Sequence, residues 1–278
     1  ELALSRLKAI RKQQNNHLRI WGISATIGNL VEAMEVLLGN DAANEKSIVI
    51  RSSGKKNMEI HTVLPTSIEV LPWSGHIGLK LLPEIVNIIR SSQTTLVFTN
   101  TRAMAEIWYH HILNYDENLA GLLAMHHGSL SGEVRDWVEE NLHAGTLKAV
   151  ICTSSLDLGV DFRPVDTVIQ IGSPKGVARF TQRAGRSGHQ PGAVSKIYFI
   201  PTHALELVEI SAIKEAVTSN KVEKREPLVM CFDVLMQYLV TLSIGEGFVA
   251  EEILQEIKHT DGFNRSAPEE WKWMSPCL

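Results

Sequence analysis

The sequence predicts an α/β protein built on a parallel β-sheet. Five short runs of almost continuous apolar residues occur along the chain, a pattern typical of strands that are covered on both faces. Segments of helical length and periodicity separate them, which favours parallel strands joined by right-handed crossovers. The expected strands are 95–99, 122–126, 149–153, 167–171 and 196–200. The expected helices between them are 102–114, 132–144 and 175–186.

The chain before this block is expected to belong to a different unit. An apolar run at 18–23 predicts another strand, which ends in Ser24-Ala25-Thr26 and precedes a helix at 30–38. Glycine, proline and serine are dense in 50–78, as expected of a strand-bearing crossover between domains. We therefore expect a first part at 1–70 and the sheet at 71–220.

The residue composition of the sequence changes after Pro227. Leu- and Val-rich helices are expected at 228–242 and 250–258, separated by a glycine turn. Ser266 with Glu269 three residues later predicts the start of another helix. Residues 221–278 are thus expected to begin a small helical domain.

The composition excludes several classes of protein. The 278 residues are 44% hydrophobic, enough for a full core, but no apolar run approaches the ~20 residues that a bilayer span needs. The first twelve residues mix charge and leucine and do not form a secretory signal, so we expect a cytoplasmic protein. The three cysteines have no CxxC spacing, which predicts neither a disulfide framework nor a zinc site.

Positive charge is concentrated in one segment, although the net charge is -4. Residues 175–200 contain five basic residues and no acidic one. Arg179, Arg183 and Arg186 are spaced i, i+4 and i+7, so a helix would place them on one face. A solvated surface stripe is the alternative, but the lack of an acidic partner favours recognition of a polyanion such as a triphosphate.

Small polar residues follow several predicted strands, at the edge where parallel sheets bind ligands. Thr153 and Ser154 could hold a phosphate of nucleic acid, and Asp161 could accept a hydrogen bond from a ribose hydroxyl. A helix cap followed by an aspartate turn explains the same residues and stays open. Two adjacent histidines, His126 and His127, would point to opposite faces of a strand, so no metal site is expected.

Five segments, taken in order, resemble motifs III, IV, IVa, V and VI of superfamily 2 helicases. They are SAT at 24–26, VFTNTR at 97–102, HHGSLS at 126–131, CTSSLDLGVD at 152–161 and QRAGRSGH at 182–189. The amino-acid sequence of 125–209 is most similar to the large helicase-related (Lhr-type) family. Within it, the ligase-associated DEXH-box helicases of bacteria are the most similar branch.

The resemblance implies a motor in which two RecA-like domains bind ATP with Mg²⁺ between them and move along nucleic acid. This chain would supply the second RecA-like domain, a partial first one and the start of a winged helix. It implies single-stranded DNA as partner, DNA ligase and nuclease as further partners, and a role in DNA repair. The implied site residues are Arg186 as arginine finger, Arg183 as a supporting phosphate contact, Gly159, Asp161 and Gln182 at the nucleotide, Arg102, Gly128, Thr153 and Ser154 on the nucleic-acid backbone, and Ser24 and Thr26 for coupling.

The chain departs from the family pattern in three ways. Motif VI ends in His189 where many superfamily 2 members have arginine, and Gly132 replaces a common glutamine or arginine. Neither a GxxxxGK[ST] loop nor a DExH box occurs in the 278 residues, so the chain alone is expected to be inactive, with ATP bound mainly by a first domain upstream.

Two other functions compete with the motor. One is a non-catalytic RecA-like module that binds nucleic acid; the other, a different nucleotide-binding α/β enzyme, would need a GxGxxG motif that is absent. The motor interpretation requires Arg183 and Arg186 to project toward a nucleotide held by a neighbouring lobe. Side chains paired with carboxylates of their own fold would contradict it.

Overall fold

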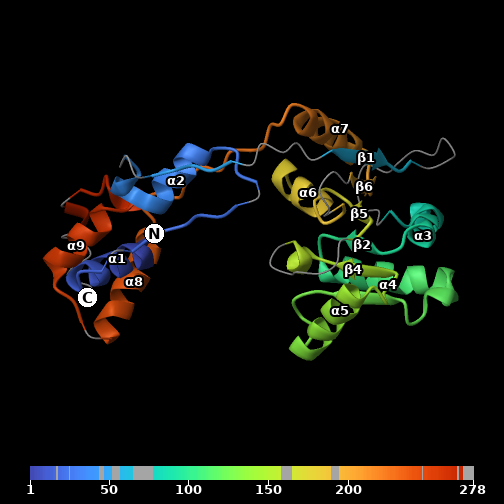
Figure 1. The fold of residues 1–278 in the computed structure, drawn as a ribbon, viewed down its shortest axis with the longest axis horizontal. Helices are drawn as coiled ribbons and strands as arrows, with labels where there is room; N and C mark the ends of the chain where they lie inside the picture. Colours follow the sequence, from blue (N-terminus) through green and yellow to red (C-terminus); the bar gives the residue numbers. More distant parts are fainter. Residues whose placement is uncertain are drawn as a thin grey trace. The chain divides into compact units, whose positions relative to one another are not determined.

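The computed structural model describes residues 1–16, 18–24, 26–43, 47–51, 57–64, 78–157, 165–188, 194–245, 247–267 and 269–271. The chain divides into two compact units (Figure 1). Unit 1 combines Glu1–Ser52 with Lys224–Leu278, and unit 2 is Ser53–Glu223.

Unit 2 is built on a parallel sheet, as the sequence predicts. Its strand order is β1-β6-β5-β2-β4-β3, and every neighbouring pair is parallel. All five expected strands are present. The strands are β1 (Met58–Thr62), β2 (Thr95–Phe98), β3 (Leu123–His126), β4 (Ala149–Cys152), β5 (Thr167–Ile171) and β6 (Ser195–Ile200).

Helices cover both faces of this sheet. Side chains alternate along β2, so that Leu96 and Phe98 face one apolar cluster and Val97 faces the other. The cluster around Phe98 includes residues of α5, α6 and α7, and the cluster around Val97 includes residues of α3 and α4. The helices are α3 (Leu82–Ser91), α4 (Arg102–Tyr115), α5 (Gly132–Ala144), α6 (Val177–Ala184) and α7 (Leu205–Thr218), with short 3-10 turns η2 (Leu79–Leu81), η3 (Glu117–Leu119) and η4 (Ser154–Leu156).

Strand β1 extends the sheet to a part of the chain that precedes the boundary expected near residue 70. It lies in the segment expected to hold a crossover strand, and it pairs with β6 from Met58 opposite Ser195 to Thr62 opposite Phe199. The sheet therefore includes residues that the sequence assigned to the first part. The domain limits at 70 and 220 stay predictions.

Helix α6 is shorter than the expected segment 175–186, and local chemistry sets its ends. It begins after Gly176, whose φ of 137° is not helical, and the carboxylate of Glu223 accepts hydrogen bonds from the Val177 and Ala178 backbone N–H groups at 3.0 and 3.1 Å. It ends at Ala184, so Arg186 lies beyond the last turn. The expectation that three arginines share one helix is therefore wrong for Arg186.

Unit 1 joins helices from the two ends of the chain in one core. Leu2 of α1 packs with Leu235 and Leu239 of α8 and with Ile253 of α9, and Arg6 forms an ion pair of 2.8 Å with Glu256. The N-terminal segment thus packs against the segment after Pro227. The elements are α1 (Leu2–Gln13), α2 (Leu30–Leu38), η1 (Gly39–Ala43), α8 (Phe232–Ile244), α9 (Ala250–Lys258) and η5 (Asp261–Phe263).

The strand expected at 18–23 is wrong. The described residues of this segment have irregular backbone, and Trp21 and Ile23 are 82% and 91% exposed. A strand needs a neighbour to satisfy its backbone hydrogen bonds, and the described part of unit 1 contains no strand that could pair with it. The helix after it is confirmed as α2, which begins after Asn29 and not after the SAT segment.

The described residues contain neither a membrane-spanning helix nor a metal-binding cluster. None of the helices there is both long and apolar enough to cross a membrane. The same residues contain no group of three or more His, Cys, Asp or Glu placed to hold a metal ion. The cytoplasmic location stays a prediction.

Candidate functional site

The carboxyl ends of β2, β4 and β3 lie side by side, and the four expected nucleic-acid contacts follow these strands. Arg102 is the first residue of α4, after β2, and its guanidinium donates to the hydroxyl of Ser129 in the loop after β3. Gly128 in that loop is exposed, and no atom lies within 4 Å of a Cβ built on it. The structure therefore brings the loops after β2 and β3 together at one edge.

The loop after β4 supplies the remaining expected contacts at this edge. Thr153 is buried, and its backbone N–H donates to the carbonyl oxygen of His126 at 3.3 Å. Ser154 is exposed and begins the short turn η4. The four residues expected to touch nucleic acid thus follow three adjacent strands of one sheet.

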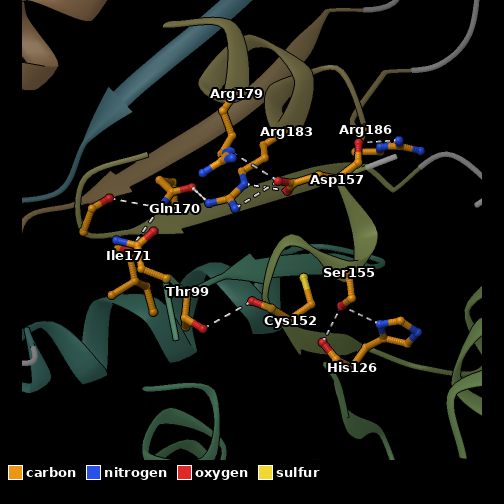
Figure 2. Close-up of polar contacts among 12 residues, drawn as sticks. Thr99, His126, Cys152, Ser155, Asp157, Gln170, Ile171, Arg179, Arg183 and Arg186 are labelled. Carbon is orange, nitrogen blue, oxygen red and sulfur yellow. Dashed lines mark hydrogen bonds and ion pairs between the residues drawn. The ribbon is translucent and has the colours of Figure 1, made fainter. Parts of the chain in front are cut away.

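Asp157, at the far end of the same loop, binds Arg183 through its carboxylate. The Arg183 Nε donates to Oδ1 at 2.7 Å and Nη2 donates to Oδ2 at 3.2 Å (Figure 2). The remaining terminal nitrogen, Nη1, donates to Oε1 of Gln170 at 2.7 Å, and the guanidinium carbon lies 4.7 Å from the ring centroid of Phe98. Arg183 is 1% exposed, so its guanidinium is satisfied within its own domain.

The expectation of an arginine stripe without an acidic partner is wrong. Arg179, although 40% exposed, also approaches the carboxylate of Asp157, at 3.5 Å. The acidic partner comes from the loop after β4, which is distant in sequence, so the charge count over 175–200 could not reveal it. Arg183 is thus held by Asp157 and Gln170 within its own domain, and its expected role as a supporting phosphate contact stays a prediction.

Arg186 lies next to this cluster but in a different environment. Its Nη2 donates to the backbone carbonyl oxygen of Asp157 at 2.6 Å, so it binds the same loop without using the carboxylate (Figure 2). The side chain is half-buried. Burial lowers the pKa of Arg186, and the nearby charge of Asp157 opposes that shift. A partly desolvated guanidinium interacts more strongly with an anion than one in water.

Two residues of this network had no assigned role in the sequence analysis. Gln170 lies in the middle of the buried strand β5, where its amide donates to the carbonyl oxygens of Ile171 and Gly172 at 3.1 and 2.9 Å. A buried amide needs hydrogen-bond partners, so a glutamine inside an apolar strand could have indicated a buried polar network at this position. Asp157 appeared in the sequence analysis only as one residue of the segment 152–161, without a role of its own.

The other expected site residues are placed as follows. Gln182 is half-buried on α6. The Ser24 hydroxyl accepts from the Thr26 backbone N–H at 3.4 Å, in the irregular segment before α2. Gly159, Asp161 and His189 lie outside the described residues, so their expected roles stay predictions.

Two family models match the chain. The helicase conserved C-terminal domain matches residues 78–190, which include every strand of unit 2 from β2 to β5 and helix α6. The winged helix domain of large helicase-related proteins matches residues 215–278.

Known relatives match over more than half of the chain. The chain is 36% identical over 259 residues to the ATP-dependent helicase Lhr-Core of Methanocaldococcus jannaschii, covering 92% of this chain and 29% of the relative. It is 39% identical over 147 residues to the Lhr helicase/uracil glycosylase of Escherichia coli, covering 53% of this chain and 9% of that protein. The chain therefore spans less than a third of the length of these relatives.

The fold is also that of a solved Lhr structure. Mycobacterium smegmatis helicase Lhr, bound to ssDNA and AMP-PNP, superposes with a TM-score of 0.86 and 26% identity over 98% of this chain and 35% of that one. These matches show the family independently of the arginines, so the pairing of Arg183 with Asp157 does not overturn the family. The narrower similarity to the ligase-associated branch stays a prediction. The chain belongs to the Lhr-type family of superfamily 2 helicases.

Proposed function

We propose that this chain forms the second motor domain and adjoining segments of an ATP-dependent helicase that moves on single-stranded DNA. The loop 153–157 carries the proposal. Its first residues lie at the edge expected to touch nucleic acid, and its last residue, Asp157, binds Arg183 and Arg186. One short loop thus connects the expected nucleic-acid edge with the arginines expected at the nucleotide. A motor requires such a connection if the nucleotide state is to change the affinity for DNA.

Nucleic acid would bind along the ends of β2, β4 and β3. A guanidinium at Arg102, an uncovered backbone at Gly128 and the polar groups of Thr153 and Ser154 suit contacts to phosphate and sugar, which position a strand without specifying its sequence. Single-stranded DNA is the proposed strand because the M. smegmatis relative is bound to ssDNA.

ATP with Mg²⁺ is the proposed cofactor. The donor chemistry of the chain fits a phosphate, since the guanidinium of Arg186 is always charged, half-buried and held beside the β4 loop by a hydrogen bond to the Asp157 carbonyl oxygen. Arg186 would act as the arginine finger, with Gln182, Gly159 and Asp161 beside the nucleotide. The phosphate cradle and the Mg²⁺-binding acid would come from sequence outside these 278 residues, so the chain alone would not hydrolyse ATP.

Three finer features belong to the same proposal. Ser24 and Thr26 would couple the nucleotide to domain closure, and His189 would stand where related helicases have arginine. A role in DNA repair, with DNA ligase and nuclease as partners, is proposed from family resemblance alone.

ATP hydrolysis with and without single-stranded DNA tests this function. A full-length protein that carries this chain should hydrolyse ATP faster when DNA is present, and the 278-residue chain should show no turnover. Turnover by the chain alone would refute the division of labour. DNA binding by a full-length protein without ATPase activity would favour the alternative, a non-catalytic RecA-like nucleic-acid-binding module.

A further inference from the structure

The side chain of His126, at the end of β3, connects the β4 loop to helix α5. Its Nδ1 lies 2.7 Å from the hydroxyl of Ser155, and its Nε2 lies 3.0 Å from Oε1 of Glu139. His126 is 2% exposed, whereas the Glu139 side chain is 33% exposed. Figure 2 shows the imidazole of His126 directed at Ser155.

The hydrogen atoms of this network can be assigned. An ionised Glu139 can only accept, so Nε2 carries a hydrogen and a neutral imidazole accepts the Ser155 hydroxyl hydrogen at Nδ1. Burial lowers the pKa of His126, and the charges of Arg135 and His127 act in the same direction, while Glu139 opposes them. The neutral ring therefore has a defined tautomer, and Glu139 selects it.

His126 also holds the loop through its backbone. Its carbonyl oxygen accepts from the Thr153 N–H at 3.3 Å. The Ser155 hydroxyl lies 2.9 Å from the same oxygen, but its single hydrogen goes to Nδ1 when the ring is neutral. One residue thus anchors the positions on both sides of Ser154. Ser154 itself is exposed and is one of the residues proposed to bind nucleic acid.

We propose that His126, oriented by Glu139, is a positioning residue that fixes the Thr153–Ser155 turn for contact with nucleic-acid phosphate. The inference rests on the proposed function, because it concerns the same nucleic-acid edge. His126 contacts no phosphate itself. It holds the turn in its binding geometry before the strand arrives, which lowers the ordering cost of binding.

Matched variants of the 278-residue chain separate orientation from charge. Ser155→Ala removes the hydroxyl and Glu139→Leu removes the acceptor, whereas Glu139→Gln keeps an amide oxygen that can still accept from Nε2. The readout is the dissociation constant for a single-stranded oligonucleotide, measured by fluorescence anisotropy over a series of salt concentrations. Arg102→Ala is the comparison for loss of a direct phosphate contact.

Ser155→Ala and Glu139→Leu should weaken binding by about three- to tenfold, the effect of losing about one hydrogen bond. Glu139→Gln should stay within about twofold of the unsubstituted chain. The slope of log Kd against log salt should not change for these variants, because no cation is lost, whereas Arg102→Ala should reduce it by about one. A changed slope, or unchanged affinity in both Ser155→Ala and Glu139→Leu, would overturn the inference.

Hydrogen exchange of the free chain gives a second readout that needs no DNA. The amides of 153–157 should exchange faster in Ser155→Ala and Glu139→Leu, and at the original rate in Glu139→Gln. If the unsubstituted chain binds no single-stranded DNA, the proposed function fails, and the exchange rates still decide whether His126 holds the turn. Equal exchange in all variants would refute the positioning role.

Discussion

The guanidinium of Arg183 forms two hydrogen bonds with the carboxylate of Asp157, and both residues are buried. This pair fastens the end of the β4 loop to helix α6. The other end of the same loop carries Thr153 and Ser154, at the edge proposed to touch nucleic acid. The Arg183–Asp157 pair therefore fixes the conformation of the β4 loop. It sets the separation between the proposed DNA contacts and the Asp157 carbonyl oxygen that binds Arg186.

Asp157→Asn should destabilise unit 2 strongly. It leaves the Arg183 charge buried without its carboxylate, and breaking one side of a buried pair costs about 3 kcal/mol or more. Because the chain divides into two compact units, exchange protection of the β4 amides is the appropriate measurement, since it reports on unit 2 alone. Asp116→Asn is the control, since its partner Arg90 has a side chain that is 51% exposed and can be rehydrated. Equal losses in the two variants would contradict the importance of burial.

Gly128→Ala should separate binding from stability. No atom lies within 4 Å of the added Cβ, so the free energy of unfolding should change by less than about 0.5 kcal/mol. A nucleic-acid backbone lying against this residue would meet the new methyl group, and the affinity for single-stranded DNA should fall. Equilibrium binding and thermal unfolding of the same sample check both statements. Unchanged affinity would remove Gly128 from the proposed interface.

Gly188→Ala should destabilise the fold within motif VI. Gly188 has a φ of 63°, and an added Cβ would lie 2.6 Å from the carbonyl oxygen of Val194. A left-handed conformation alone costs alanine about 1 kcal/mol or more, and the collision adds to it. Gly132→Ala is the matched control, because open space surrounds that position. Thermal unfolding should show a clear loss only for Gly188→Ala, and equal melting temperatures would contradict the geometry.

The Arg90–Asp116 pair predicts a pH dependence of stability. The Arg90 hydrogen bond lowers the pKa of Asp116 from 3.8 to about 2 in the folded protein. A depressed folded pKa stabilises the protein above the unfolded pKa, and that contribution disappears as the pH falls from 3.8 toward about 2. The stability difference between the unsubstituted chain and Asp116→Asn should therefore shrink over this window. Denaturant unfolding at stepped pH measures it, and a constant difference would rule out the pair as the cause.

The strands of unit 2 were predictable because strands buried on both faces have nearly continuous runs of apolar residues. The runs that form β2 and β4 are almost continuously apolar, and every one of their residues is buried. Helix α5 has the bounds expected from its length and periodicity, and in the structure Ser131 caps its start and Gly145 ends it with a φ of 74°. These are local signals.

The predictions that failed depend on contacts between distant parts of the chain. Arg183 has the same helical spacing as an exposed arginine, and only the fold shows that Asp157 meets it. The apolar run at 18–23 resembles a strand, but Trp21 and Ile23 have no strand beside them in the described part of unit 1. Pairing partners, and not local preference, decide both cases.

The most direct test of the account is the rate of DNA-stimulated ATP hydrolysis by a full-length protein carrying Arg186→Ala. Finger arginines contribute about 10³ or more to phosphoryl-transfer rates, so turnover should fall by a factor of that order. Arg179→Ala is the control, because that side chain approaches the same aspartate but is 40% exposed, and it should change turnover only a few-fold. Near-normal turnover in Arg186→Ala, with the fold intact, would contradict the assignment of Arg186 as the finger.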